Sequence, residues 1–368
     1  MSHKVRALVV DDTVVYRKII SDLLGEHPDV EVIGTAANGE MAVSKAKQLK
    51  PDLVTLDLEM PVMDGLEALP LLKKENPDMA ILMVSAHTTA GARTTMKALQ
   101  AGAMDFIAKP DRSSMEASRL EIKQQLNNIL RGVVSKFKVQ AALNGRTSGA
   151  RSSLEPALPK VAPQADSISS RMAKITQHIR PEVIAIGIST GGPQALTKVI
   201  PRLPANLKLP VVIVQHMPPV FTRALADSLS KTSPLDIIEA SNNQKLEPGK
   251  VYIAPGGKQM KVVKETGYGK IVITDDPPEN HCKPSVDYLF RSLSNAYKGN
   301  VLSIIMTGMG KDGVTGMRLL KRHGAKTIAQ DQQSCTVFGM PMEAIKAGVV
   351  DKIITLEDIA KEILAGIK

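Results

Sequence analysis

The chain has 368 residues, of which 43% are hydrophobic and 23% charged, with a formal net charge of +10 and two cysteines. These values are ordinary for a globular protein, and two cysteines in no metal or redox spacing exclude a fold built on disulfides. No apolar run reaches the ~18 residues that a membrane-spanning helix needs and no signal-peptide pattern is present, so we expect a cytoplasmic protein without membrane insertion.

The first third of the chain alternates strand-like and helical patterns. Short apolar runs between residues 5 and 110 are separated by amphipathic stretches, and a further helix is expected at about 116–130. Strands that alternate with helices predict a parallel sheet with helices on both faces. The predicted strands are Ala7–Val10, Val30–Thr35, Leu53–Leu56, Ala80–Val84 and Asp105–Ala108, with helices such as Val14–Leu24 and Met41–Leu49 between them.

Periodicity fades from about Val139 to Arg180, where Asn-Gly, Ser-Gly and several prolines leave room for at most a short helix near Ile168–Ile179. Counted from Lys136 to Arg180, this Ser-, Ala- and Pro-rich part of the chain carries more than half of the excess positive charge. A basic stretch of this composition is typical of a solvated linker. Aromatic residues, at 3% of the chain, are too scarce for base stacking, so we expect no nucleic-acid partner.

A second α/β pattern begins at Val183 and includes one predicted hairpin, Lys261–Val263 with Lys270–Ile273. The fold class is therefore α/β, with two doubly wound parallel-sheet domains at 1–132 and 181–368 joined by a linker at 133–180. The other predicted strands are Val183–Ile188, Val211–Gln215, Lys250–Ala254, Leu302–Met306 and Lys326–Ala329, and the predicted helices are Gly192–Pro201, Pro219–Thr232, Ser285–Tyr297, Gly313–His323 and Met342–Ala347.

Polar residues follow the strands of the first domain. Asp11 and Asp12 end the first strand and Asp57 the third, while Ser85 and Lys109 end the fourth and fifth. Ligands of an open parallel sheet bind outside the carboxyl ends of its strands, so these side chains are expected to share one crevice. Converging carboxylates repel unless a cation is present, and clustered hard oxygens suit Mg²⁺. Taken singly, the first two aspartates fit equally well as N-caps of the next helix.

These residues lie in motifs that resemble the receiver domain of bacterial two-component response regulators: LVVDD at 8–12, LDLEMPVMDGLEAL at 56–69, MVSA at 83–86 and GAMDFIAKP at 102–110. The resemblance covers about residues 4–130 and implies a flavodoxin-like domain that is phosphorylated on Asp57 by a histidine kinase. It implies a Mg²⁺ site formed by Asp11 (through water), Asp12, Asp57 and the backbone carbonyl of Glu59, with Ser85 and Lys109 sensing the phosphate and Phe106 as the switching aromatic. A buried core phenylalanine is the alternative for Phe106.

The second domain carries its own set of residues at strand ends. The run IAIGISTGGP at 184–193 passes from a strand through a glycine-rich turn into a helix, a turn that can cradle phosphate or expose Ser189 beside oxyanion-binding N–H groups. It lacks the Lys-Ser/Thr of a P-loop. Two other strands deliver His216 and Asp312, which completes the nucleophile, base and orienting acid of a serine hydrolase. In isolation, this histidine fits a packed loop residue and this aspartate a turn or N-cap residue.

Several segments of this domain resemble the catalytic domain of chemoreceptor methylesterases, the family of protein-glutamate methylesterases and glutaminases. They are IGISTGGPQAL at 186–196, VQHMPPVFTRALA at 214–226, VYIAPGGKQM at 251–260, HCKPSVDYLFRS at 281–292, MTGMGKDGVTGM at 306–317 and AQDQQSCTVFGMP at 329–341. The resemblance covers about residues 180–366. The chain departs from it at Ile188, where alanine is frequent, and at Lys311, where asparagine is common. His281 and Pro284 belong to a matching segment but receive no firm role.

The resemblance implies that Ser189 is the nucleophile, His216 the general base and Asp312 its orienting acid, with the backbone N–H groups of Thr190 and Met309 forming the oxyanion hole. It implies a Rossmann-like hydrolytic domain without a cofactor in the esterase site. The expected activity is a phosphorylation-activated removal of methyl groups from glutamate esters on chemoreceptor helices, together with glutamine deamidation. The expected phosphodonor is the histidine kinase of a chemotaxis system.

Two rival functions remain open at this point. A response regulator with a DNA-binding output needs a helix-turn-helix or winged helix after the linker, and salt-dependent duplex binding would support it. A nucleotide-binding domain would use the turn at Gly191 and Gly192, and equilibrium binding of ATP or NAD would support it.

Overall fold

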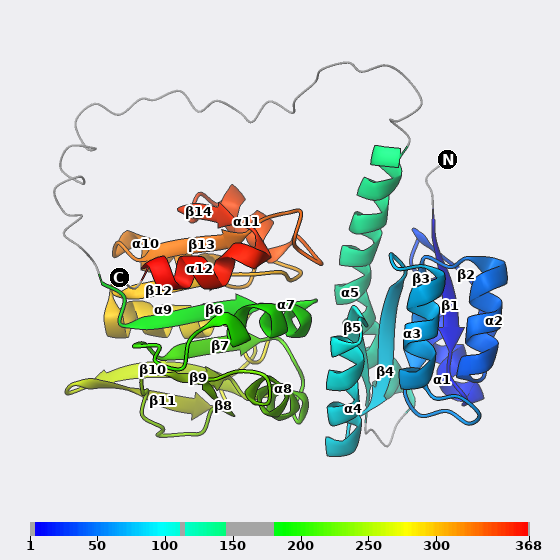
Figure 1. Ribbon diagram of the computed structural model, residues 1–368, viewed down its shortest axis with the longest axis horizontal. Helices are drawn as coiled ribbons and strands as arrows, with labels where there is room; N and C mark the ends of the chain where they lie inside the picture. The colour runs from blue at the N-terminus through cyan, green and yellow to red at the C-terminus, as the bar shows by residue number, and fades with distance from the viewer. Residues whose placement is uncertain (1–3, 111–114, 145–179, 367–368) are drawn as a thin grey trace, which may run out of the picture.

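The computed structural model describes residues 4–110, 115–144 and 180–366, so the short helix expected near 168–179 lies outside the described residues. Two α/β units lie next to each other, each with a central parallel sheet between helices (Figure 1). Both predicted doubly wound domains are thereby confirmed. No helix among the described residues is long and apolar enough to cross a membrane.

The first unit contains a five-stranded parallel sheet in the order β2-β1-β3-β4-β5. This is the flavodoxin-like order, in which the chain reverses direction beside the first strand and opens a crevice there. Every residue of β3 is buried, as expected for a central strand covered on both faces. The elements are β1 Val5–Val10, α1 Val14–Gly25, β2 Val30–Ala36, α2 Gly39–Leu49, β3 Leu53–Asp57, α3 Gly65–Glu75, β4 Ala80–Ala86, α4 Thr89–Gln100, β5 Asp105–Lys109 and α5 Met115–Asn144.

The second unit contains a seven-stranded parallel sheet in the order β14-β13-β12-β6-β7-β9-β8. Its central strands are continuous apolar runs, and all residues of β6, β7 and β12 are buried. The elements are β6 Val183–Ile188, α7 Gly192–Val199, η1 Ile200–Arg202, β7 Val211–Gln215, α8 Phe221–Ser230, β8 Asp236–Glu239, β9 Lys250–Ile253, α9 Val286–Tyr297, β12 Val301–Ile305, α10 Val314–Arg322, β13 Lys326–Gln330, α11 Met340–Lys346, β14 Lys352–Ile354 and α12 Leu356–Gly366.

The predicted hairpin is present as an antiparallel pair, β10 Gln259–Glu265 and β11 Tyr268–Thr274. Its tight connection contains Gly267 at a φ of 84°, a left-handed conformation that glycine adopts without steric cost. The sequence analysis did not predict β8 and β14. Both are short edge strands with exposed positions, so neither carries the continuous apolar run that marks the central strands.

The helix expected to end near residue 130 is longer than predicted, since α5 continues to Asn144. Beyond the predicted end, α5 approaches the second unit closely. At Gly132, a Cβ atom would lie 2.4 Å from a methyl group of Val337 in the second unit. Only a residue without a side chain permits this close approach of the helix backbone.

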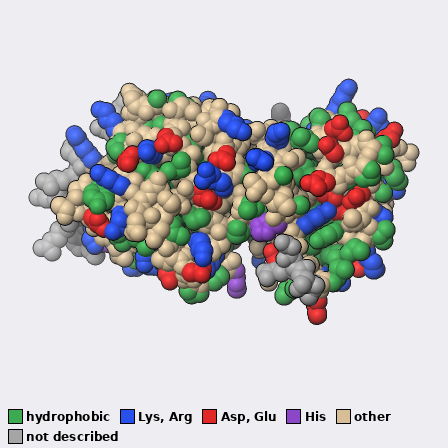
Figure 2. Space-filling view, turned by 90° about the horizontal axis from the view of Figure 1, so that it is seen from below, with side chains coloured by type: hydrophobic (Ala, Val, Ile, Leu, Met, Phe, Trp, Pro, Cys, Tyr) green, Lys and Arg blue, Asp and Glu red, His purple; other side chains and the backbone are tan. Residues whose placement is uncertain are grey.

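Helices α4, α7 and α8 meet between the two units, and α5 stands beside them (Figure 1). Gln194 of α7 donates hydrogen bonds from Nε2 to the carbonyls of Leu99 (3.0 Å) and Ala103 (2.9 Å). On the face shown in Figure 2, Lys and Arg side chains are interspersed with Asp and Glu rather than gathered in one patch. This face therefore offers no continuous basic surface of the kind that nucleic acid requires.

Candidate active site and phosphoacceptor site

The three aspartates of the first unit converge as predicted. Oxygen atoms of Asp11, Asp12 and Asp57 all lie within 4.8 Å of one another at the carboxyl ends of β1 and β3. The N-cap of α1 is Thr13, which excludes the two neighbouring aspartates as its caps. Instead, Oδ1 of Asp11 accepts hydrogen bonds from the backbone N–H (2.9 Å) and hydroxyl (2.6 Å) of Thr13.

One cation serves two of these carboxylates. Nζ of Lys109 lies 2.7 Å from Oδ2 of Asp57 and 3.0 Å from Oδ2 of Asp11. Burial raises the pKa of Asp57 to about 6, with the Lys109 ammonium opposing and the Asp11 carboxylate adding to this shift. The buried Oδ2 of Asp11 has no well-aligned hydrogen-bond donor. Three carboxylates beside one ammonium leave excess negative charge, which fits a site that holds a hard divalent cation such as Mg²⁺.

The other predicted residues of this crevice occupy distinct positions. Ser85 is fully buried, and its Oγ accepts a hydrogen bond from the Thr95 hydroxyl (2.8 Å). The backbone N–H of Glu59 donates to the Asp57 carboxylate, while the Glu59 side chain is exposed. Phe106 is buried, but not in the core of its own unit alone: its ring stacks on Phe221 of α8, with ring centroids 4.3 Å apart.

In the second unit, Ser189 directly follows β6 at the centre of the sheet. Its backbone N–H donates to the Thr307 carbonyl (2.9 Å), and its carbonyl accepts from Nε2 of Gln215 (2.9 Å). A Cβ atom on Gly308 would lie 2.7 Å from the Ser189 Cβ, so the loop after β12 approaches the serine too closely for any other residue. Gly191, at a φ of 75°, turns the chain into α7.

His216 follows β7 and Asp312 lies in the loop after β12, and their side chains meet at the same edge of the sheet. Nε2 of His216 lies 2.9 Å from Oδ2 of Asp312, and both side chains are largely buried. Burial would lower the pKa of His216, but the adjacent Cys282 and the bond to Asp312 raise it above its ordinary value. The aspartate therefore orients the ring and stabilises its protonated form, as the acid of a triad must do.

Asp312 is held by more than the histidine. The N-terminus of α9 points at it: Oδ2 accepts from the Val286 N–H (2.7 Å), and Oδ1 from the Asp287 N–H (3.0 Å) and the Ser285 hydroxyl (2.9 Å). Burial alone would raise the pKa of Asp312, but these donors and His216 lower it overall. The aspartate caps α9 rather than the helix that follows it, for which Gly313 is the N-cap.

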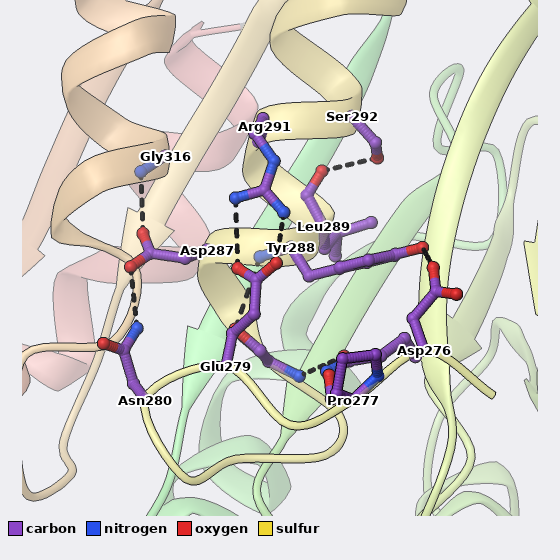
Figure 3. A network of polar contacts seen from close by, with 12 residues as sticks. Asp276, Pro277, Glu279, Asn280, Asp287, Tyr288, Leu289, Arg291, Ser292 and Gly316 are labelled. Carbon is purple, nitrogen blue, oxygen red and sulfur yellow. Dashed lines mark hydrogen bonds and ion pairs between the residues drawn. The ribbon is translucent and has the colours of Figure 1, made fainter. Parts of the chain in front are cut away.

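A further set of residues supports this carboxylate, and the sequence analysis did not single it out. Nδ2 of Asn280 donates both to Oδ1 of Asp312 (3.0 Å) and to Oδ2 of Asp287 (2.9 Å), and Asp287 in turn accepts from the Gly316 N–H (2.7 Å). Figure 3 shows the contacts of Asp287 with Asn280 and Gly316 beside the ion pair of Glu279 with Arg291. An asparagine in a loop gives no sequence signal of such a role.

Ser189, the third member of the predicted triad, lies on the strand end next to His216 but is not hydrogen-bonded to its imidazole. The His216 N–H donates to the carbonyl of Ile188, the residue before Ser189 (3.1 Å). Within the described residues, however, the imidazole contacts Asp312 and Cys282 and makes no hydrogen bond to the serine hydroxyl. Catalytic hydrogen bonds are often formed only when substrate is bound.

The two backbone donors expected at the oxyanion hole are available. In the described part of the chain, neither the Thr190 N–H nor the Met309 N–H donates to a protein acceptor. Thr190 is buried, and its side chain faces the Asp105 carboxylate of the first unit, as does the N–H of Gly191. Burial raises the pKa of Asp105 to about 7, an effect that hydrogen bonds from these partners oppose. The first unit therefore touches the serine-bearing loop directly.

Two family models match the chain, one in each unit. Residues 7–118 match the model of the response regulator receiver domain, and residues 184–363 match that of the CheB methylesterase. The crystal structure of the Thermotoga maritima CheB methylesterase catalytic domain resembles this chain with a TM-score of 0.50 and 37% sequence identity, covering 51% of this chain and 99% of that one.

Relatives match this chain along nearly its whole length. A protein-glutamate methylesterase/protein-glutamine glutaminase of Desulfotalea psychrophila is 46% identical over 369 residues, covering 99% of this chain and 98% of the relative. The protein of the same name from Bacillus subtilis is 42% identical over 369 residues, with 99% of both chains covered. On this domain pairing and this identity, the chain belongs to the protein-glutamate methylesterase/protein-glutamine glutaminase family.

Proposed function

We propose that Ser189, His216 and Asp312 carry out acyl transfer on the side chains of chemoreceptor glutamates. The serine hydroxyl attacks the γ-carbonyl of a glutamate methyl ester while His216 accepts its proton. The same histidine then donates the proton to the departing methoxide, which leaves as methanol. Water, deprotonated by the histidine, hydrolyses the acyl-enzyme and regenerates the serine.

The oxyanion of each tetrahedral intermediate is assigned to the N–H groups of Thr190 and Met309. Both are free of protein acceptors in the described residues and belong to the two loops that meet at Ser189. Such a pair stabilises charge that develops only in the transition state, and one donor of this kind typically contributes ~10²–10³ in rate. Deamidation of a receptor glutamine follows the same course, with ammonia as the leaving group.

The observation that carries this proposal is the buried His216–Asp312 pair, 2.9 Å apart, beside a serine on the neighbouring strand end. The test is methanol release from methylated receptor membranes by the full-length chain, with a small-molecule phosphodonor. Ser189→Ala should lower the rate by on the order of 10⁴-fold or more, because the nucleophile is lost. Ser334→Ala, a serine of the same domain outside the triad, is the control. Near-normal release by Ser189→Ala would exclude this serine as the nucleophile.

For the receiver domain, we propose that Asp57 accepts a phosphoryl group from the histidine kinase of a chemotaxis system. Asp11, Asp12, Asp57 and the Glu59 carbonyl are the proposed holders of Mg²⁺, which when bound neutralises the phosphoryl oxygens. Lys109 lies 2.7 Å from the acceptor carboxylate and is placed to pair with the phosphate. Ser85, buried against Thr95, is placed to donate its hydroxyl to a phosphoryl oxygen.

Regulation is proposed to act through the contact between the two domains. The receiver lies against the serine-bearing loop through Asp105 and against α8 through Phe106. His87, which follows β4 near Ser85, stacks on the same Phe221 ring and donates a hydrogen bond to the Pro219 carbonyl (2.9 Å). Phosphorylation changes the charge beside these residues and so biases docking, which blocks a helical substrate in the unphosphorylated form.

Removal of residues 1–140 should accordingly raise the rate of methanol release above that of the unphosphorylated full-length chain. A catalytic fragment no faster than that chain would show that docking does not block the site.

A further inference from the structure

A thiol faces the free side of the catalytic imidazole. Sγ of Cys282 lies 3.7 Å from Nδ1 of His216, on the ring edge opposite to Asp312, and 3.5 Å from the Asn280 carbonyl. The cysteine is partly exposed, whereas His216 is largely buried. The acyl-transfer mechanism requires no thiol, which leaves the role of this residue open.

The spacing of these two atoms matches a metal site. A tetrahedral Zn²⁺ ion binds sulfur at about 2.3 Å and imidazole nitrogen at about 2.0–2.1 Å, which places the two ligand atoms about 3.5 Å apart. The observed 3.7 Å between Sγ of Cys282 and Nδ1 of His216 is within 0.2 Å or so of that separation. Small rotations of the two side chains are therefore sufficient to bind one ion between them.

The other ring nitrogen of His216 already has a carboxylate partner. An ionised Asp312 only accepts hydrogen bonds, so Nε2 of His216 carries the proton that it donates to Oδ2 of Asp312. A metal ion that displaces the proton shared by Nδ1 and Sγ then binds the lone pair of Nδ1, which lies 3.7 Å from the sulfur. A histidine whose other nitrogen donates to a carboxylate is the usual arrangement of protein zinc ligands, because the carboxylate fixes the tautomer and raises ligand basicity.

We propose that Cys282 and His216 form an inhibitory binding site for a soft divalent cation of the Zn²⁺ class, with water in the remaining coordination positions. Binding forms one metal–sulfur and one metal–nitrogen bond, and the thiol proton passes to solvent. The ion occupies the lone pair that accepts the Ser189 proton, so acyl transfer stops. Metal binding itself needs only the observed geometry, whereas the inhibition rests on the proposed role of His216 as general base.

This site differs in chemistry from the receiver crevice. The aspartates of the receiver offer hard oxygens that suit Mg²⁺, while a thiolate with an imidazole selects Zn²⁺, Co²⁺ or Cd²⁺. The two sites can therefore be filled independently: excess Mg²⁺ saturates the first without occupying the second.

The direct test is Co²⁺ binding to the reduced full-length chain in excess Mg²⁺, followed by near-ultraviolet absorption. Wild type should show the thiolate-to-cobalt charge-transfer band of a cysteine ligand. Cys282→Ser should lose the band, and Cys335→Ser should keep it, because the chain has only these two cysteines. A wild-type chain without the band, or a band that survives in Cys282→Ser, would overturn the site.

The inhibitory consequence is measured by methanol release with increasing Zn²⁺ and then with a chelator. Wild type should lose activity reversibly, while Cys282→Ser should need about tenfold more Zn²⁺ or higher for the same loss. Equal sensitivity of the two proteins would refute inhibition at this site, even if the cobalt band is present. Absence of methanol release from both proteins before Zn²⁺ is added would instead count against the proposed esterase function.

Discussion

The two domains use the same edge of the same kind of sheet for opposite purposes. At the carboxyl ends of the receiver strands, two buried carboxylates share one lysine, and Oδ2 of Asp11 lacks a well-aligned donor. At the corresponding edge of the catalytic sheet, the two oxygens of Asp312 accept five hydrogen bonds. One site is short of positive charge and donors, and the other is saturated with them.

This difference explains what each site does. A carboxylate cluster with unmet charge has its largest affinity for an added cation and a phosphoryl group, so its state changes when they arrive. A saturated carboxylate does not change between resting and reacting states, and it keeps the imidazole fixed while protons move. The first arrangement suits a switch, and the second suits a catalyst.

The largest effect is expected when charge is removed from the saturated carboxylate, Asp312. Asp312→Asn replaces an acceptor that serves His216 and the α9 N-terminus, so the ring loses its orienting partner. We expect kcat for methanol release to fall by about 10⁴-fold with the catalytic domain still folded. The matched control is Asp275→Asn, because Asp275 is an exposed carboxylate that pairs with Lys283 in the loop before α9. This variant should change kcat little. A loss of only a few-fold in Asp312→Asn would mean that the carboxylate does not orient the base.

A second test weakens the contact between the two domains. Gly132→Leu places a side chain where a single Cβ would already lie 2.4 Å from Val337. Overpacking of this kind costs about 1–3 kcal/mol, so undocking should raise basal methanol release of the unphosphorylated chain about fivefold or more.

Asn128→Leu, on an exposed position of the same helix, is the control and should leave basal activity unchanged. If Gly132→Leu has the basal rate of wild type, the α5–Val337 contact does not restrain the enzyme.

Removing charge from the receiver crevice should be favourable for stability, whereas removing it from the triad should be unfavourable for kcat. Asp57→Asn abolishes phosphorylation, but it also relieves the burial of a carboxylate whose pKa is raised to about 6. We therefore expect this variant to resist chemical unfolding better than wild type in the absence of Mg²⁺, by about 1 kcal/mol. Denaturant titration of the receiver transition measures this, and a destabilised Asp57→Asn would contradict the description of the crevice as charge-strained.

The smallest expected effect is the pH dependence of the stability difference between wild type and Asp57→Asn. Because the folded-state pKa of Asp57 is about 6 and the unfolded value about 3.9, the folded receiver binds the proton more tightly. This contribution to stability is fully present below pH ~3.9 and is lost as the pH rises to about 6. The stability difference between wild type and Asp57→Asn should therefore widen from pH 4.5 to pH 7 without Mg²⁺. A difference that stays constant over this range would show that Asp57 is not perturbed.

Much of both sites could be predicted from the sequence because strand ends in parallel sheets converge. Asp57, Ser189 and His216 lie at or directly after the ends of buried strands, so the strand pattern alone placed each of them at a sheet edge. The same argument fails for β8 and β14, whose exposed edge positions interrupt the apolar run.

The residues that could not be predicted lie in loops whose path depends on tertiary contacts. Asn280 and His281 both have positive φ values, 51° and 63°, and no periodic pattern announces such a turn. The resulting loop brings Asn280 to Asp312 and Cys282 to the free edge of His216.

The strand order of the catalytic domain has a consequence for its synthesis. The neighbours β12, β6 and β7 supply the three members of the proposed triad, although β12 is made more than a hundred residues after β6. A growing chain can pair β6 with β7 early, but the other edge of β6 stays unpaired until β12 has been synthesised. Hydrolytic activity should therefore be absent from every nascent chain that ends before that strand.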